Sequence, residues 1–235
     1  METTRSLLGT LHLATGFIAL AAFWVPLFLK KGAKAHRAFG WVFVGAMAVI
    51  LGSAATMTLS TVIFDGANRN AALFLGFLTL ITFSAVWTGV RVLRHKNEPQ
   101  WLRSRGQLFM LVVIGAAGVG LLWQWWETRF ALFFVFGLVG LIIAIPELLA
   151  LRKPLKVEPR FWWFTHMQNM IVSGMAAHIA FFAFGASRLW PDLYTGQPWW
   201  VMLIPWVAPF PIAFAAIALI QRHYRRKFRV AAAAQ

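Results

Sequence analysis

Four histidines within long apolar runs are the residues of this chain whose types and spacing suggest chemistry. His12 and His178 are predicted near one membrane face, and His36 and His166 near the other. His12 lies about 8 Å inside its apolar run, and His166 lies at a similar depth from the opposite face. His178 follows His166 by about 18 Å along one helix, so we expect it at the level of His12. The spacing predicts two histidine pairs at two depths.

Histidine pairs of this kind are typical of bis-histidine haem sites, because the iron takes one axial imidazole from each of two facing helices. The four histidines are therefore candidate ligands of one or two b haems. His166 and His178 are about 120° apart around their helix, which argues against two haems on one face. A single haem or metal site at His36 and His166 is thus a variant of the hypothesis. The alternative for each histidine is a hydrogen bond to a neighbouring carbonyl or hydroxyl group.

Two further features lie near these histidines. His12 and His36 are each followed four residues later by glycine, Gly16 and Gly40, on the same helical face. Glycine there leaves room for a flat ring or for a closely packed helix. Glu147, the one carboxylate well inside an apolar run, is predicted at the level of His36 and His166. It is a candidate metal ligand, proton relay or quinone partner, and a salt bridge to a nearby arginine is the alternative.

Seven helices must position these groups. The 235-residue chain is 60% hydrophobic and 12% charged, whereas soluble domains are roughly 25% charged. Seven apolar runs are close to the length of about 20 residues that spans a bilayer: 7–29, 38–61, 72–94, 107–126, 130–151, 161–186 and 200–221. We therefore expect an all-α, polytopic seven-helix bundle that forms one domain over residues 1–235. Three prolines at 205, 209 and 211 predict a kinked or broken last helix.

The cations indicate the topology. Eighteen of the 22 Lys and Arg residues follow the first, third, fifth and seventh runs. Because cytoplasmic loops are enriched in Lys and Arg, we expect the N-terminus outside and the C-terminus in the cytoplasm. The opposite side has only Arg5, Arg69, Arg129 and Arg188. The net charge of +15 is thus explained by topology and contact with anionic lipid, and it does not indicate nucleic-acid binding.

Two short signatures resemble an uncharacterised family of bacterial predicted membrane proteins, a domain of unknown function. The first comprises His12, Gly16, Lys31, Gly32, His36, Arg37, Gly40 and Met47, and the second comprises Trp163, His166, Met170, Ala176, Ala177 and Phe181. The resemblance covers most of the chain and implies a polytopic bacterial membrane protein. His12, His36 and His166 match the family's pattern, and His178 has no clear match in it. The predicted architecture is also similar to that of the ascorbate-reducible transmembrane b-type cytochromes.

Three functions remain open at this stage. The first is a haem-binding redox protein that moves electrons in or across the membrane, with a quinone or another redox protein as partner. The second is a transporter of a small solute or protons, and the third is a non-catalytic accessory subunit of a membrane complex. An intramembrane zinc hydrolase is disfavoured, because the chain has no closely spaced histidine pair and no intramembrane Asp. The absence of cysteine excludes thiolate and iron–sulfur sites.

The distribution of cations predicts the location of the C-terminus. A reporter that works only in the cytoplasm, such as a fluorescent protein, should be active when it is fused after Gln235. A reporter at this position that is active only outside the cytoplasm would contradict the topology.

Overall fold

The computed structural model describes residues 2–65, 68–156 and 158–233. The side chains of residues 1–6 and 229–235 are not described, so those of Arg5 and Arg229 are not placed. The described residues form helices and no strand. Seven helical segments among them are long and apolar enough to cross a membrane. The predicted all-α class is therefore confirmed, as is the presence of seven long apolar helices that could span a membrane, and the orientation of the termini stays a prediction.

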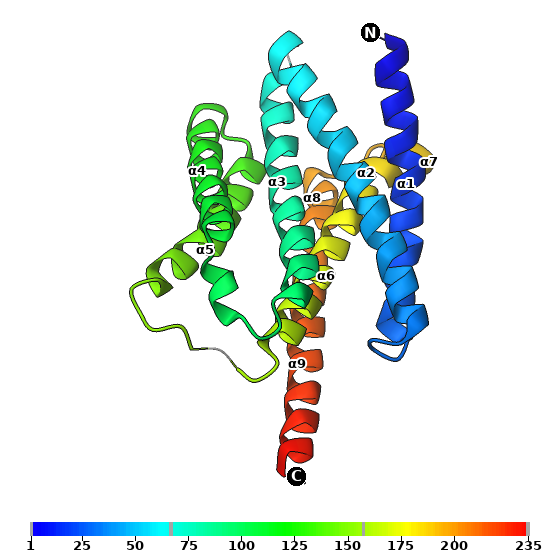
Figure 1. The fold of residues 1–235 in the computed structure, drawn as a ribbon. Coiled ribbons are helices and arrows are strands. Elements are labelled where there is room, and N and C mark those ends of the chain that lie inside the picture. The colour runs from blue at the N-terminus through cyan, green and yellow to red at the C-terminus, as the bar shows by residue number, and fades with distance from the viewer. Residues whose placement is uncertain (1, 66–67, 157, 234–235) are drawn as a thin grey trace.

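The spans follow one another with short connections (Figure 1). The first five are α1 (Glu2–Phe28), α2 (Lys34–Phe64), α3 (Arg69–Arg91), α4 (Arg105–Thr128) and α5 (Ala131–Ala150). Short 3₁₀ segments at Val92–Arg94 and Pro99–Arg103 join α3 to α4. The sixth span consists of α6 (Phe161–Ala180), a π-helical turn (Phe181–Gly185) and α7 (Ala186–Leu189). A 3₁₀ turn (Pro191–Leu193) follows, and the seventh span comprises α8 (Trp199–Val207) and α9 (Pro209–Ala233).

Proline divides the last span, as the sequence predicts. α8 ends at Val207, and α9 begins at Pro209. A proline at the first position of a helix is favoured, because its missing N–H would have no partner there. Pro205 lies inside α8. The predicted interruption of this helix is therefore confirmed.

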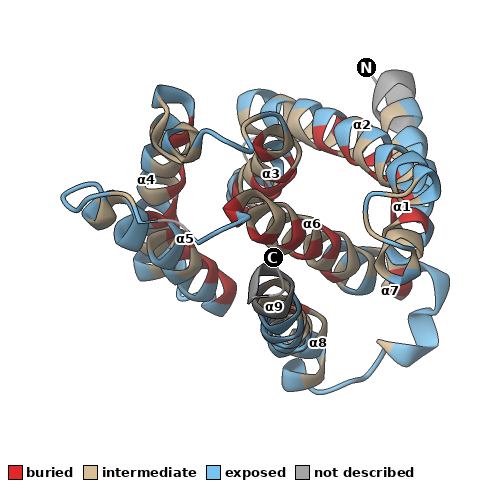
Figure 2. Ribbon diagram, turned by 60° about the horizontal axis from the view of Figure 1, so that its bottom comes forward, coloured by how far each residue is buried: buried red, intermediate tan, exposed pale blue. Residues whose placement is uncertain are grey.

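Four helices form the part of the fold that contains the histidines. Seen end-on, α1, α2, α3 and α6 form a ring, with the α4–α5 pair on one side and α8–α9 on another (Figure 2). α2 packs between α1 and α3, and α6 contacts both α3 and α1. Buried residues from α1, α2 and α3, including Ala19, Phe43, Met47 and Val86, form one core cluster. Met170 of α6 packs against the same cluster.

The α4–α5 pair is held together by glycines. A Cβ atom added to Gly118 would lie 2.9 Å from the carbonyl oxygen of Gly137 and 3.3 Å from the Cα atom of Gly140. The backbones of the two helices therefore approach as closely as small residues allow, which is how membrane helices maximise dispersion contacts without a hydrophobic driving force. A second core cluster, which includes Phe74, Phe136 and Trp206, joins this pair to α3, α6 and α8.

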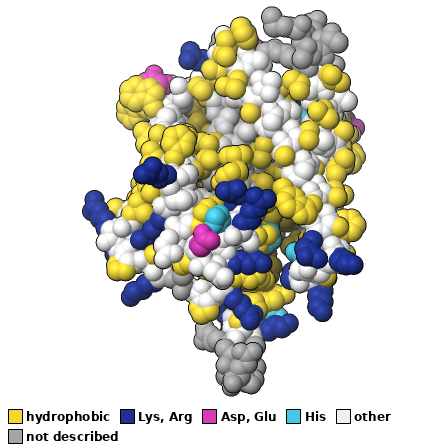
Figure 3. Space-filling model, viewed as in Figure 1, with side chains coloured by type: hydrophobic (Ala, Val, Ile, Leu, Met, Phe, Trp, Pro, Cys, Tyr) yellow, Lys and Arg dark blue, Asp and Glu magenta, His cyan; other side chains and the backbone are white. Residues whose placement is uncertain are grey.

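One end of the molecule is strongly basic. Figure 3 shows Lys and Arg side chains gathered over the half of the molecule toward which α9 points. They come from the turns after α1, α3 and α5 and from the end of α9. We refer to this end as the basic face.

The glycine contact gives a stability prediction. Gly118→Ala should lower the free energy of unfolding by about 1–3 kcal/mol, because the added methyl group overpacks a backbone contact. Thermal unfolding of the purified protein in detergent measures this change. Gly120→Ala is the matched control, since nothing lies within 4 Å of its added Cβ atom. Equal melting temperatures for the two variants would contradict the close packing of α4 on α5.

Candidate functional site

His36 lies in the first turn of α2, against the end of α1. Its Nδ1 atom is 3.2 Å from the carbonyl oxygen of Pro26. The Nζ atom of Lys31 donates to the same oxygen at 2.9 Å and to the carbonyl oxygen of Leu27 at 2.8 Å. The last carbonyls of a helix have no partner within that helix. Lys31 and His36 therefore supply the donors that the end of α1 lacks, and these bonds fix the orientation of the His36 ring.

His166 lies on α6 and faces α3. Its Nδ1 atom is 2.7 Å from the carbonyl oxygen of Gly89. A Cβ atom at Gly89 would lie 2.5 Å from Cε of Met170 and 3.0 Å from Cβ of Asn169. Glycine at this position therefore lets α6 pack closely on α3, where a larger residue would require Met170 and Asn169 to shift. The position of His166 thus depends on the contact between α3 and α6.

His36 and His166 are close enough to interact electrostatically, and Lys31 interacts in the same way with His36. Their helices, α2 and α6, each pack against α3 and α1. Both histidines lie near the start of their helices, at the end of the molecule that carries the basic face. Their predicted pairing at one haem or metal ion stays a prediction.

His12 contacts α2 at a different level. Its Nδ1 atom is 2.9 Å from Oγ of Ser53, a residue only 5% exposed. The Ser53 hydroxyl lies 2.8 Å from the carbonyl oxygen of Val49 and 2.9 Å from that of Ile50. The single hydroxyl proton is donated to one of these carbonyls, so the oxygen accepts the proton of Nδ1.

His178 uses both of its ring nitrogens. Nδ1 is 2.7 Å from the carbonyl oxygen of Gly174 on its own helix. Nε2 is 3.1 Å from Nε1 of Trp24, and the indole N–H can only donate. The rings of Phe23 and Trp24 also contact the imidazole edge to face, at centroid distances of 5.4 and 5.5 Å. His178 is therefore a structural bridge between α6 and α1.

The expected pairing of His12 with His178 is not formed. His12 precedes Trp24, the partner of His178, by twelve residues, which is about 18 Å along α1. The Phe17 and Phe181 rings, 5.8 Å apart, show that the end of α6 reaches only the middle of α1. Figure 1 shows α6 running obliquely across the bundle. Distance along this inclined helix is not depth in the membrane, which is why the prediction was wrong.

The hydrogen bonds determine which ring nitrogen carries the proton. Carbonyl oxygens only accept, so His36, His166 and His178 donate from Nδ1, and His12 donates to Ser53. A neutral imidazole then keeps its lone pair on Nε2. No described residue forms a hydrogen bond with Nε2 of His12, His36 or His166. These three imidazoles are therefore fixed through Nδ1, and their Nε2 atoms have no hydrogen-bond partner in the described part of the chain.

Open space lies beside two of the histidines. No atom comes within 4 Å of a Cβ atom built on Gly16 or Gly40. Both glycines are half-buried. Close packing against another helix, the alternative explanation for these two glycines, therefore does not apply to Gly16 and Gly40. It does apply to Gly118. Their place beside His12 and His36 leaves room for a group that the chain itself does not supply.

Glu147 does not join the histidines. It is exposed on α5, a helix that packs along α4. The described residues contain no group of three or more His, Cys, Asp or Glu side chains that could hold a metal ion. The expected cluster of Glu147 with His36 and His166 is thus not formed, because α4 and α3 separate α5 from α2. The expected alternative, a salt bridge to Arg152, is not among the ion pairs of the described residues either.

The sequence gives little indication of three partners of the histidines. Trp24 lies 154 residues from His178, and Ser53 lies 41 residues from His12. The acceptor for His166 is a backbone carbonyl, which any residue carries. The apolar surroundings of Ser53 were the one available hint, since a hydroxyl at membrane depth needs a partner.

Comparisons with known proteins add no further constraint. No family model, no curated protein and no solved structure matches the chain. The resemblance to the uncharacterised bacterial family therefore stays a prediction.

The bond between Trp24 and His178 can be tested by a double-mutant cycle. Trp24→Phe and His178→Ala should each lower the free energy of unfolding, and the double variant should lose about 1 kcal/mol less than the sum. Thermal unfolding in detergent measures the coupling. Additive effects would contradict the hydrogen bond.

Proposed function

We propose that this multi-pass membrane protein is a redox protein in which His36 and His166 would hold one b-type haem. The observation that carries the proposal is the state of the two imidazoles. The two side chains are close enough to interact electrostatically, each is fixed by a hydrogen bond from Nδ1 to a backbone carbonyl, and neither Nε2 atom has a hydrogen-bond partner in the described part of the chain. Histidines that bind metals are usually held in this way, because the bond to the other nitrogen fixes both tautomer and ring orientation.

The residues present fit such a group in their chemistry. Two neutral imidazoles form a complete axial ligand set, and two ligands suffice where a metal ion bound by side chains alone needs three or four. The absence of a three-residue metal cluster among the described residues is therefore compatible with haem. The open space at Gly40, one turn along α2 from His36, supports the same conclusion.

The chain's own residues would perform three tasks. The carbonyls of Pro26 and Gly89 hold the two rings in orientation. The buried side chains of Phe43 and Met47 exclude water from the interior of the ring of helices. The positive charge of Lys31 near His36 favours an added electron, because a cation stabilises the more negative redox state.

A b-type haem with two imidazole ligands supplies one-electron transfer and has no open position for a substrate. We therefore infer electron transfer within the membrane, with a quinone or another redox protein as partner. The distribution of cations favours a basic face in the cytoplasm, and the resemblance to the bacterial family favours the bacterial inner membrane. Glu147 and His178 have no part in this proposal.

The absorption spectrum tests the proposal. Protein purified from cells supplied with iron and a haem precursor should be red and show a Soret band. His36→Ala and His166→Ala should each abolish that band, since a single imidazole holds haem weakly. His178→Ala should retain it, because the Nε2 atom of His178 is bonded to Trp24.

The same preparations give the control and the contrary result. Each variant is compared with the native chain by its elution volume and melting temperature, so that loss of colour is distinguished from loss of fold. A colourless, metal-free native protein would end the redox proposal and favour the transport or accessory hypothesis. If His178→Ala were the only variant to lose the band, His36 and His166 would not be the haem ligands.

A further inference from the structure

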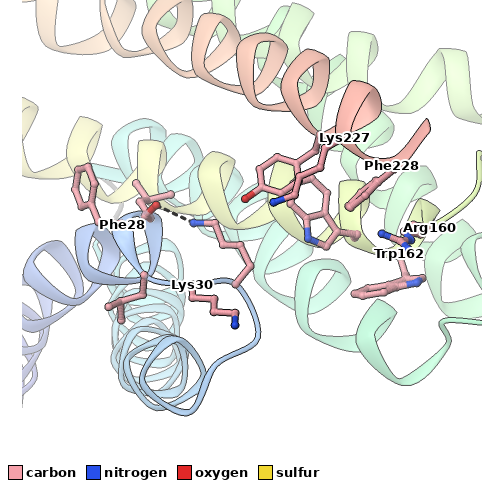
Figure 4. Close-up of a pocket in the computed structure, with 11 residues that line it drawn as sticks. Phe28, Lys30, Arg160, Trp162, Lys227 and Phe228 are labelled. Carbon is pink, nitrogen blue, oxygen red and sulfur yellow. Dashed lines mark hydrogen bonds between the residues drawn. The ribbon is translucent and has the colours of Figure 1, made fainter. Parts of the chain in front are cut away.

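A pocket opens on the basic face where three membrane spans end together. It has a volume of about 580 Å³ and lies among the end of α1, the start of α6 and the end of α9. Figure 4 shows the labelled side chains coming from these three segments. The ends of membrane spans lie at the level of the lipid headgroups. The pocket is therefore placed at the boundary between the apolar interior and the aqueous phase.

The pocket has an excess of positive charge. Its lining includes Lys30, Lys31, Arg160 and Lys227 and no Asp or Glu. The nearby Glu158 is bonded to Arg225, with a distance of 2.9 Å between Oε2 and Nε. Within the described part of the chain, none of the four cations in the lining forms an ion pair. The site thus lacks a counter-ion of its own.

Two of the cations are held in fixed positions. Lys31 donates to two carbonyl oxygens at the end of α1, which leaves one N–H of its ammonium group free for another acceptor. Burial lowers the pKa of this lysine, because the charged form has lost part of its hydration. The guanidinium group of Arg160 lies 4.2 Å from the centre of the Phe228 ring. An anion in the pocket would offset the lost hydration.

Aromatic side chains form the wall between these charges. The Trp163 and Tyr224 rings lie 4.3 Å apart, and Phe228 contacts Trp163 edge to face at 5.6 Å. Tryptophan and tyrosine favour this level of a membrane, because each has an apolar body and a polar tip. Phe28, which is part of the lining, is 82% exposed. The cationic, aromatic site therefore also has an exposed apolar side chain that an acyl chain can contact.

We propose that this pocket binds the phosphate headgroup of an anionic phospholipid, with an acyl chain against the exposed apolar end of α1 at Phe28. Basic pockets between membrane helices are suited to such headgroups. A free phosphate ion has the same charge chemistry, but it gains nothing from the aromatic wall or from the apolar end of α1. The proposal does not depend on haem binding at His36 and His166.

Native mass spectrometry of the purified full chain tests this site. The probes are phosphatidylglycerol, phosphatidylcholine and inorganic phosphate, each added at the same concentration. Phosphatidylglycerol should bind most tightly. The variant K30Q/K227Q should bind it roughly 10- to 30-fold more weakly, since each cation near a membrane surface contributes a several-fold factor. Lys31 is left intact, because it also completes the end of α1.

The matched control removes the same charge from another part of the basic face. Arg152 and Lys153 lie outside the pocket, so the variant R152Q/K153Q should bind phosphatidylglycerol as the native chain does. Equal weakening in both double variants would show diffuse attraction and overturn the site. Equal binding of phosphatidylcholine, or of phosphate alone, would overturn the lipid assignment. If K30Q/K227Q does not elute as a single folded species, Arg160→Gln provides the same comparison with one charge removed.

Discussion

The hydrogen bonds donated by Nδ1 of the membrane-level histidines are the interaction on which the proposed site depends. A bilayer offers no water to satisfy a polar side chain, so each imidazole must find an acceptor within the protein. His36 and His166 reach backbone carbonyls of neighbouring helices, and His12 reaches a serine hydroxyl. The same bond that satisfies one nitrogen fixes the direction of the other. The same hydrogen bonds therefore satisfy the polar side chains and orient the imidazoles for a ligand.

Glycine serves two different purposes in this fold. At Gly89 and Gly118 its missing side chain lets helices touch, and a methyl group there would collide with a neighbour. At Gly16 and Gly40 no neighbour approaches. The first pair explains how the helices pack without a hydrophobic driving force between them. The second pair leaves space beside histidines, which supports the proposal that these helices hold a group from outside the chain.

The sequence predicts the helices better than it predicts their contacts. Span number and the break near Pro209 follow from length, hydropathy and the missing N–H of proline, which are local properties. The proximity of His36 to His166 also follows, because both lie near the ends of spans that meet at one face. The pairing of His12 with His178 fails, since the tilt of α6 is set by packing. Glu147 lies away from the histidines for a similar reason: α5 packs on α4, which no pattern in the sequence specifies.

The stoichiometry of haem in the purified native protein is the most direct test of the central claim. His36 and His166 interact electrostatically and have no hydrogen-bond partner at Nε2 in the described part of the chain, whereas Nε2 of His178 is bonded to Trp24. A pyridine haemochrome assay combined with a protein determination measures the ratio. The account predicts one b-type haem per chain. A ratio of two would contradict the structural role of His178, and protein without haem after expression with a sufficient haem supply would contradict the site itself.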